Sequence, residues 1–211
     1  MSNPPAPSLD PRRSSLPPDF DLYLASVSPR RQELLQQIGI AFRQLRVDVP
    51  EVLARDEAPR VFVQRLALAK ARAGLAQLAA EDPRPVLGAD TVVVLEERVL
   101  GKPRDEADAT AMLRLLAGRS HQVMSAVAVM NAERKAVKLQ VSTVTFRDLD
   151  EAEIRAYGYS GEGHDKAGAY AIQGCAALFI ANLEGSYSGV MGLPLFETGM
   201  ILKEFGINPC R

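Results

Sequence analysis

Residues 86–103 form a largely apolar segment that contains two side chains of opposite charge, Asp90 near its start and Lys102 near its end. Asp90 interrupts a run of Val, Leu, Gly and Ala, and an ionised carboxylate buried there alone would be strongly destabilising. Asp90 therefore predicts a neighbouring cation or an open cleft. The polar residues 96–98 predict a turn, and the returning hairpin strand carries Lys102 back towards Asp90. A carboxylate and an ammonium at one rim suit a site that handles a metal ion and a phosphate together.

A second group of charges follows the first predicted strand, residues 21–25. Ser28 and Pro29 are typical of the N-cap and first position of a helix. Arg30 and Arg31 then fall in the first turn, where a cation opposes the helix dipole at about 0.3–1 kcal/mol each. Free backbone N–H groups at that end favour an anion. Two arginines behind a Ser-Pro cap therefore predict a phosphate site rather than a solvated surface.

Three further polar positions depend on how the chain folds. Glu51 lies on a predicted loop, where most carboxylates are simply solvated. Lys70 falls at the border of the apolar stripe of a helix predicted for residues 59–80, and such a lysine extends its ammonium to water unless the helix faces the cleft. The glycine-rich residues 161–174 carry Lys166 and Gln173, and glycines let a backbone approach a ligand closely.

Hydrophobic periodicity and turn residues give the expected elements. The two histidines, His121 and His164, have no predicted partner, so we expect both to be exposed. Predicted strands cover residues 21–25, 42–47, 86–95, 99–100, 121–130, 137–146 and 176–181, and predicted helices begin at Pro29 and cover 59–80, 105–117, 150–157 and 193–205.

Composition bounds the class of protein. The chain has 211 residues, 47% apolar and 24% charged, and a net charge of −1, which argues against a nucleic acid polymer or a membrane surface as partner. Six prolines and few apolar residues in 1–20 predict a disordered tail, and the length of the chain suits one large domain or one domain with a lobe. Two distant cysteines favour a reducing, cytoplasmic setting.

Several motifs, taken together, resemble the Maf family of nucleoside triphosphate pyrophosphatases over about residues 22–207. They are LAS at 24–26, SPRR at 28–31, GADT at 88–91, GKP at 101–103, DKAGAYAIQG at 165–174, GSY at 185–187 and GLPL at 192–195. The resemblance implies an α/β fold with a central mixed β-sheet split by a deep cleft and flanked by helices, similar to inosine triphosphate pyrophosphatases. It also implies that residues 21–211 form a single domain with two lobes around the cleft. The expected activity is that of a cytoplasmic house-cleaning enzyme that releases a nucleoside monophosphate and pyrophosphate.

The resemblance carries roles over to particular residues. Asp90 matches the general base, and Glu51 and Asp90 are the acids expected to hold a divalent cation, Mg²⁺, Mn²⁺ or Co²⁺. Whether Asp90 is base, metal ligand or both stays open. Other polar active-site positions of the family match Ser28, Arg31, Glu51, Lys70 and Lys102. We expect Ser28, Arg31, Lys70, Lys102 and also Lys166 of the glycine-rich loop to bind the substrate. Arginine forks and lysine point charges suit the anionic oxygens of a triphosphate.

Arg30, Thr91 and Gln173 together resemble the subgroup that prefers dTTP and UTP. A glutamine amide can pair with uracil or thymine and, when flipped, with cytosine, so modified pyrimidines stay open. A homodimer also stays open. Two other classes remain: a non-catalytic nucleotide-binding regulator of cell division or septum formation, and a nucleotidyltransferase, for which no second substrate motif is present.

Overall fold

The structure is a computed structural model that describes residues 20–210. The predicted tail, residues 1–20, therefore lies outside the described residues except for Phe20. The elements are β1 (Leu22–Leu24), α1 (Pro29–Gln37), β2 (Phe42–Gln44), α2 (Pro59–Leu75), β3 (Val86–Leu95), β4 (Arg98–Leu100), α3 (Glu106–Leu116), β5 (Ser120–Met130), β6 (Lys135–Phe146), α4 (Glu151–Ser160), η1 (Ala167–Ala169), η2 (Cys175–Phe179), β7 (Ile180–Glu184), α5 (Tyr187–Met191) and α6 (Leu195–Glu204). Within this range no helix is long and apolar enough to cross a membrane.

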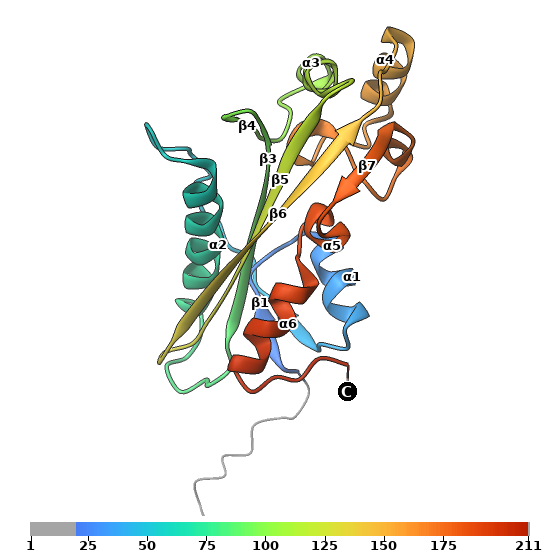
Figure 1. Ribbon diagram of the computed structural model, residues 1–211. Helices are drawn as coiled ribbons and strands as arrows, with labels where there is room; N and C mark the ends of the chain where they lie inside the picture. Colours follow the sequence, from blue (N-terminus) through green and yellow to red (C-terminus); the bar gives the residue numbers. More distant parts are fainter. Residues whose placement is uncertain (1–19, 211) are drawn as a thin grey trace, which may run out of the picture.

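A mixed seven-stranded sheet forms the centre of the molecule, in the order β2-β1-β3-β5-β6-β7 with β4 paired to β3. β1 runs parallel to β2 and β3, whereas β3, β5, β6 and β7 pair antiparallel along the chain. The long strands β3, β5 and β6 span the height of the molecule in Figure 1. The α/β fold with a central mixed sheet is therefore confirmed.

The edge of β3 is covered in two places with an opening between them. β1 pairs with Val86 and Leu87 near its start, and β4 pairs with Val93–Leu95 near its end. In the described part of the chain, the residues between have a strand partner on the β5 side only. Asp90 and Thr91 lie in this opening. A gap in strand pairing thus makes the cleft, and the strand that continues through it carries polar side chains into it.

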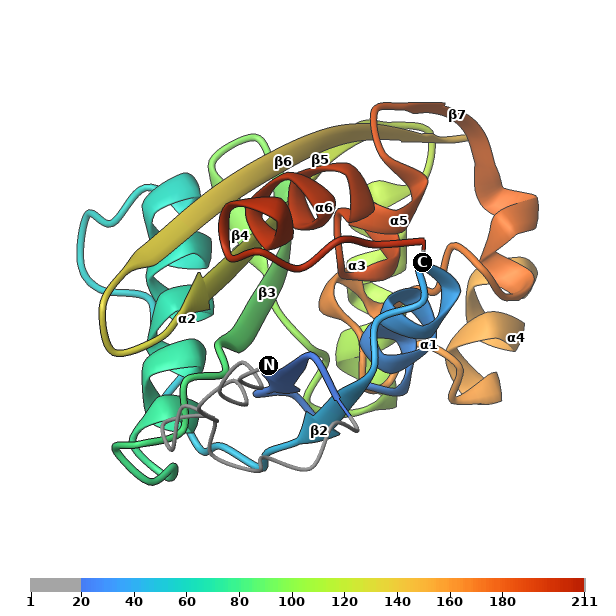
Figure 2. The ribbon, with the colours of Figure 1, turned by 90° about the horizontal axis from the view of Figure 1, so that it is seen from below.

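Helices cover both faces of the sheet (Figures 1 and 2). α2 packs on one face, where Phe62 and Leu66 meet alternate residues of β3 and β5 such as Val92 and Met124. α1 and α6 pack on the opposite face, against the residues of β1, β3 and β5 that point the other way. A third core cluster lies under α3, α4 and the two 3₁₀ helices. Alternation along β3 therefore sends Asp90 towards α2 and Thr91 towards α1.

Gly88 sets the distance between α2 and β3. A Cβ on Gly88 would lie 2.4 Å from the carbonyl oxygen of Ala67 and 2.5 Å from the backbone nitrogen of Ala71. Only glycine permits an approach this close. Gly88 and Asp90 share one face of the strand because side chains alternate. The close approach at Gly88 therefore brings Lys70, one position before Ala71, beside Asp90.

Several sequence predictions need correction. The helix predicted for residues 59–80 ends at Leu75, and the strand predicted for 176–181 is the 3₁₀ helix η2 followed by β7. His121 was expected to be exposed, but it is 2% exposed in β5 and its Nε2 lies 2.9 Å from the Tyr170 hydroxyl. His164 is exposed as predicted. The helix predicted from residue 150 is α4, and Asp150 and Glu153 form a capping box at its start.

Candidate active site

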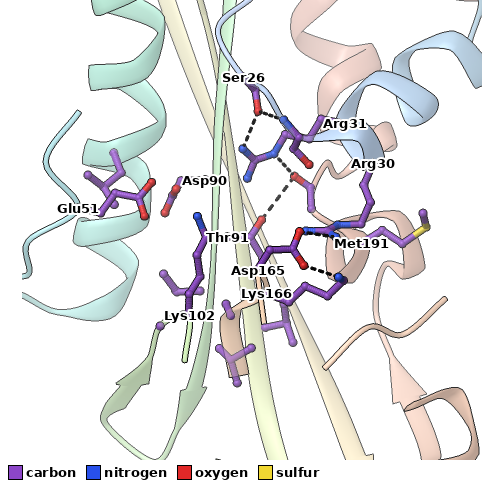
Figure 3. Close-up of a pocket in the computed structure, with 18 of the residues that line it drawn as sticks. Ser26, Arg30, Arg31, Glu51, Asp90, Thr91, Lys102, Asp165, Lys166 and Met191 are labelled. Carbon is purple, nitrogen blue, oxygen red and sulfur yellow. Dashed lines mark hydrogen bonds and ion pairs between the residues drawn. The ribbon is translucent and has the colours of Figure 1, made fainter. Parts of the chain in front are cut away.

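A cavity of about 510 Å³ opens at the gap beside β3. Its wall gathers charged and polar side chains from six separate segments of the chain, and several of these side chains are labelled in Figure 3. Those predicted from the sequence are Ser28, Arg30, Arg31, Glu51, Lys70, Asp90, Thr91, Lys102, Lys166 and Gln173. Every predicted site residue thus lines one cavity, although these residues are up to 145 positions apart in sequence, from 28 to 173.

Lys70 joins the two predicted acids. Its Nζ lies 2.6 Å from Asp90 Oδ1 and 2.6 Å from Glu51 Oε1. Asp90 is only 5% exposed, and the Lys70 side chain 13% exposed, whereas Glu51 lies at the more open end with its side chain 44% exposed. Because α2 faces the cleft, Lys70 does not extend into bulk water. Lys70 is the cation that the buried Asp90 requires.

The two carboxylates have different acidities. Burial raises the pKa of Asp90 above its ordinary value, and the charges of Lys70 and Arg31 offset this only in part. Burial acts on Glu51 in the same direction, but the hydrogen bond and charge of Lys70 outweigh it and lower the pKa of Glu51. Neighbouring carboxyl groups whose pKa values move apart are typical of sites with divided acid and base roles.

Arg31 is fixed by two hydrogen bonds. Its Nε donates to Gly192 O at 2.9 Å, and its Nη1 donates to Ser26 Oγ at 3.2 Å. Ser26 Oγ also accepts from the backbone nitrogen of Ser28 at 3.2 Å. Ser28 occupies the N-cap position of α1 as predicted, but its hydroxyl makes no capping bond. The side chain that organises this turn is Ser26, which leaves the Ser28 hydroxyl facing the cavity.

A second cationic cluster lies on the other side of β3. Arg30 Nη1 is 3.5 Å from Asp165 Oδ2, and Lys166 donates to the same carboxylate and, at 2.6 Å, to Glu162 O. Asp165 therefore holds Arg30 and Lys166 together at the rim (Figure 3). The cluster joins the N-terminus of α1 to the glycine-rich loop.

Lys102 and Gln173 complete the rim. Both are exposed and line the cavity. No hydrogen bond or ion pair among residues 20–210 occupies the Lys102 ammonium, which lies near enough to help lower the pKa of Glu51. Two polar side chains at the mouth are thus available to a ligand.

The acids present fit a divalent cation that arrives with its substrate. Within residues 20–210 no three Asp, Glu, His or Cys side chains gather where they could hold an ion. Glu51 and Asp90 supply two carboxylates around Lys70. Mg²⁺ keeps several waters and is commonly held by one or two carboxylates together with substrate phosphates. This donor set suits a hard cation whose remaining ligands are water and phosphate oxygens.

Sequence reasoning missed Ser26, the carbonyl of Gly192 and the apolar floor of the cavity. Ser26 precedes the Ser-Pro pair, and local capping rules favour Ser28 equally well. The floor includes Tyr170 and Met191, which belong to segments that read as loop and core. No local pattern marks them, because only the fold brings them to the cavity.

Comparison with known proteins identifies the family to which the chain is similar. The Maf-like protein family matches residues 21–205. A dTTP/UTP pyrophosphatase of Xanthomonas euvesicatoria pv. vesicatoria (strain 85-10) is 60% identical over 189 residues, which cover 89% of this chain and 100% of that protein. A protein of the same name from Alkalilimnicola ehrlichii (strain ATCC BAA-1101 / DSM 17681 / MLHE-1) is 55% identical over 191 residues, 89% of this chain and 94% of that protein.

Among solved structures, the Ham1 protein of Staphylococcus aureus aligns with 60% of this chain and 72% of its own, at 11% identity and a TM-score of 0.35. The family match is much stronger, since it spans all the charged side chains that line the cavity, from Arg30 to Lys166. The chain that builds this cavity therefore belongs to the Maf-like protein family.

Proposed function

We propose that this chain is a nucleoside triphosphate pyrophosphatase that hydrolyses dTTP and UTP to the nucleoside monophosphate and pyrophosphate. The observation that carries the proposal is the buried Asp90 carboxylate, 5% exposed, in a cavity whose wall is otherwise dominated by cations. A polyanion needs such a wall, and hydrolysis in addition needs a base. The names of the relatives, which match over nearly the whole chain, support the same activity.

In the proposed reaction, water attacks the α-phosphorus and the bond from that phosphorus to the bridging oxygen breaks. Asp90 accepts the proton of the water, and pyrophosphate leaves with the bridging oxygen. Water is a poor nucleophile, so a base positioned against it contributes typically about 10²–10⁴-fold. Burial supports this role, because a raised pKa makes Asp90 a stronger base than an exposed aspartate. The charge of Lys70 favours the ionised form of Asp90 and so opposes the effect of burial.

The cations divide between binding and charge stabilisation. Arg31, fixed by Ser26 and Gly192, presents a guanidinium that is already oriented for phosphate oxygens. Lys102 has no hydrogen-bond or ion-pair partner among the described residues. Its ammonium is therefore available to stabilise the negative charge that develops on the leaving pyrophosphate. Lys166 lies across β3 at the opposite rim. We assign all three to substrate binding, together with Ser28.

Glu51 and Asp90 would hold a divalent cation, Mg²⁺, Mn²⁺ or Co²⁺. When bound, such an ion adds positive charge at the phosphate oxygens and lowers the pKa of a coordinated water. Glu51 is the better permanent ligand of the two, because its lowered pKa keeps it ionised and its exposure leaves room for water. Asp90 lies deeper, where a base that contacts the water is needed.

Arg30, Thr91 and Gln173 are the proposed specificity residues. All three line the cavity, and Thr91 and Arg30 lie on the side of β3 away from Glu51 (Figure 3). A nucleotide with its phosphates near Asp90 would extend towards them. Residues that contact the base at a distance from the acids can select a substrate without altering the chemistry.

Product analysis tests the proposal. The protein is incubated with a panel of nucleoside triphosphates and Mg²⁺, and phosphorus NMR identifies the products. We expect monophosphate plus pyrophosphate, fastest from dTTP and UTP. A new phosphodiester would indicate a nucleotidyltransferase, and binding without products would indicate the regulator, which the enzyme names of the relatives do not favour. A cytoplasmic location and a homodimer are parts of the same proposal, and sedimentation tests the second.

A further inference from the structure

A buried serine lies directly behind Thr91 and has no part in the proposed reaction. Ser125 of β5 is the strand partner of Thr91 and is 0% exposed. Its Oγ lies 2.8 Å from Thr91 Oγ1 and 2.6 Å from the carbonyl oxygen of Gly189 in α5. The three groups form a chain of hydrogen bonds that begins in the core and ends at the cavity wall.

The direction of this chain follows from counting hydrogens. A hydroxyl has one hydrogen to donate, and a carbonyl oxygen can only accept. The hydrogen of Ser125 therefore lies on its contact with Gly189 O. The contact between the two hydroxyls then requires the hydrogen of Thr91, because two oxygen atoms at 2.8 Å without a hydrogen between them repel each other.

The other acceptor near Thr91 competes poorly. Gly192 O is 3.4 Å from Thr91 Oγ1 and already accepts from Arg31 Nε at 2.9 Å. A donor–acceptor distance of 3.4 Å is well beyond the usual range for two oxygen atoms. Thr91 Oγ1 therefore donates its hydrogen to Ser125 Oγ inside the protein. Towards a ligand in the cavity, the Thr91 hydroxyl can act only as a hydrogen-bond acceptor.

We propose that Ser125 is a positioning residue that fixes Thr91 as a hydrogen-bond acceptor towards the cavity. This inference rests on the proposed function and deepens it, because the ligand must then offer a donor at Thr91. Phosphate oxygens without hydrogen cannot do so. Uracil and thymine carry a hydrogen on ring N3, whereas N3 of cytosine is an acceptor. The hydrogen bonds behind Thr91 therefore select UTP and dTTP over CTP.

Thr91 can distinguish uracil from cytosine, whereas Gln173 cannot. The Gln173 amide has both a donor and an acceptor and is exposed at the rim, so it can turn to suit either ring. Thr91 cannot turn its hydrogen outward without breaking its bond to the buried Ser125. Discrimination between uracil and cytosine is then a property of a side chain that never touches the substrate.

The test compares UTP with CTP in the wild type and in Ser125→Ala, by kcat/KM and by the Kd values of the α,β-imido analogues, which cannot be cleaved at the reacting bond. In Ser125→Ala the Thr91 hydroxyl is free to rotate and donate to N3 of cytosine. We expect the preference for UTP to fall about tenfold, equivalent to about 1.4 kcal/mol. The imido analogues test the inference even if turnover is absent.

Ser142→Ala is the matched control. Ser142 is also a buried serine, 1% exposed, on the next strand, and it supports the same α5 segment through Ser186 N at 2.9 Å and Ser186 O at 3.2 Å. Its hydroxyl makes no contact with Thr91 among the described hydrogen bonds. We expect Ser142→Ala to leave the preference for UTP over CTP unchanged, so that loosening of α5 alone is excluded as the cause.

N3-methyl-UTP tests the same point without any variant that could fail to fold. The methyl group removes the N3 hydrogen, so the wild type should bind its α,β-imido form at least about tenfold more weakly than imido-UTP. Equal binding of the two, or a preference for UTP that survives in Ser125→Ala, overturns the inference. Release of monophosphate and pyrophosphate from UTP is scored separately, so the proposed function can stand while this inference falls.

Discussion

Lys70→Met should reveal how strongly the active site depends on one cation. The variant keeps the length and apolar stem of the side chain and leaves Asp90, 5% exposed, facing Glu51 with no charge between them. Removing one partner of a buried ion pair costs about 3–5 kcal/mol, against about 0–1 kcal/mol for a surface pair. With the Lys70 side chain 13% exposed, the buried case applies. For a chain of this length the melting temperature should fall by about 6–20 °C.

The pH dependence of this loss has a definite sign. Burial raises the pKa of Asp90, so its neutral form suits the fold better than its ionised form. The penalty for losing Lys70 should therefore be larger at pH 8 than at pH 5, because it shrinks as pH falls and Asp90 takes up a proton. The measurement is urea unfolding followed by circular dichroism between pH 5 and pH 8.

A double variant isolates the cause. Lys70→Met with Asp90→Asn removes both charges of the pair and should recover most of the stability lost in Lys70→Met alone. Arg104→Met is the control, since Arg104 pairs with Asp108 at 84% side-chain exposure and its loss should leave unfolding nearly unchanged. A Lys70→Met protein as stable as the wild type at pH 8, or a double variant weaker than Lys70→Met, would refute the reasoning.

Three further predictions concern the cavity wall. Glu51→Gln should raise the concentration of Mg²⁺ needed for half-maximal turnover, and an unchanged metal titration would remove Glu51 as a ligand. Arg31→Ala should weaken nucleotide binding and also lower the melting temperature, because Arg31 donates hydrogen bonds to Gly192 and Ser26. If nucleotide affinity and melting temperature were both unchanged, these hydrogen bonds would contribute neither to binding nor to stability. Gln173→Ala should reduce the preference for dTTP and UTP over purine nucleotides by roughly 0.5–1.5 kcal/mol, measured as kcat/KM ratios, and an unaltered ranking would count against its role.

Local rules predicted the parts of this site that one segment builds alone. The hairpin of β3 and β4 follows from two apolar runs around a polar turn, and its register, Val93 opposite Leu100, carries Lys102 back to the level of Asp90. The first strand and helix follow from the Ser-Pro pair in the same way. In both cases neighbours in sequence supply the geometry.

Contacts between distant segments could not be predicted so well. Lys70 reads as a surface residue because its role depends on the close approach of α2 to β3 at Gly88, 18 positions further on. The Ser-Pro cap predicts that Arg31 faces a phosphate, but nothing near Arg31 in sequence predicts that its Nε donates to Gly192 O, 161 positions away. His121 reads as exposed because nothing nearby in sequence reveals its partner Tyr170. Only tertiary packing supplies these partners.

Turnover of Asp90→Asn tests the central claim most directly. The variant keeps the shape of the side chain and removes its basicity, and Lys70 retains Glu51 as a partner. With UTP and Mg²⁺ at pH 8, we predict a loss of at least about 10²-fold in kcat, with the Kd of α,β-imido-UTP little changed and a melting temperature no lower than that of the wild type. A near-normal kcat for release of monophosphate and pyrophosphate would contradict the role of Asp90 as the base.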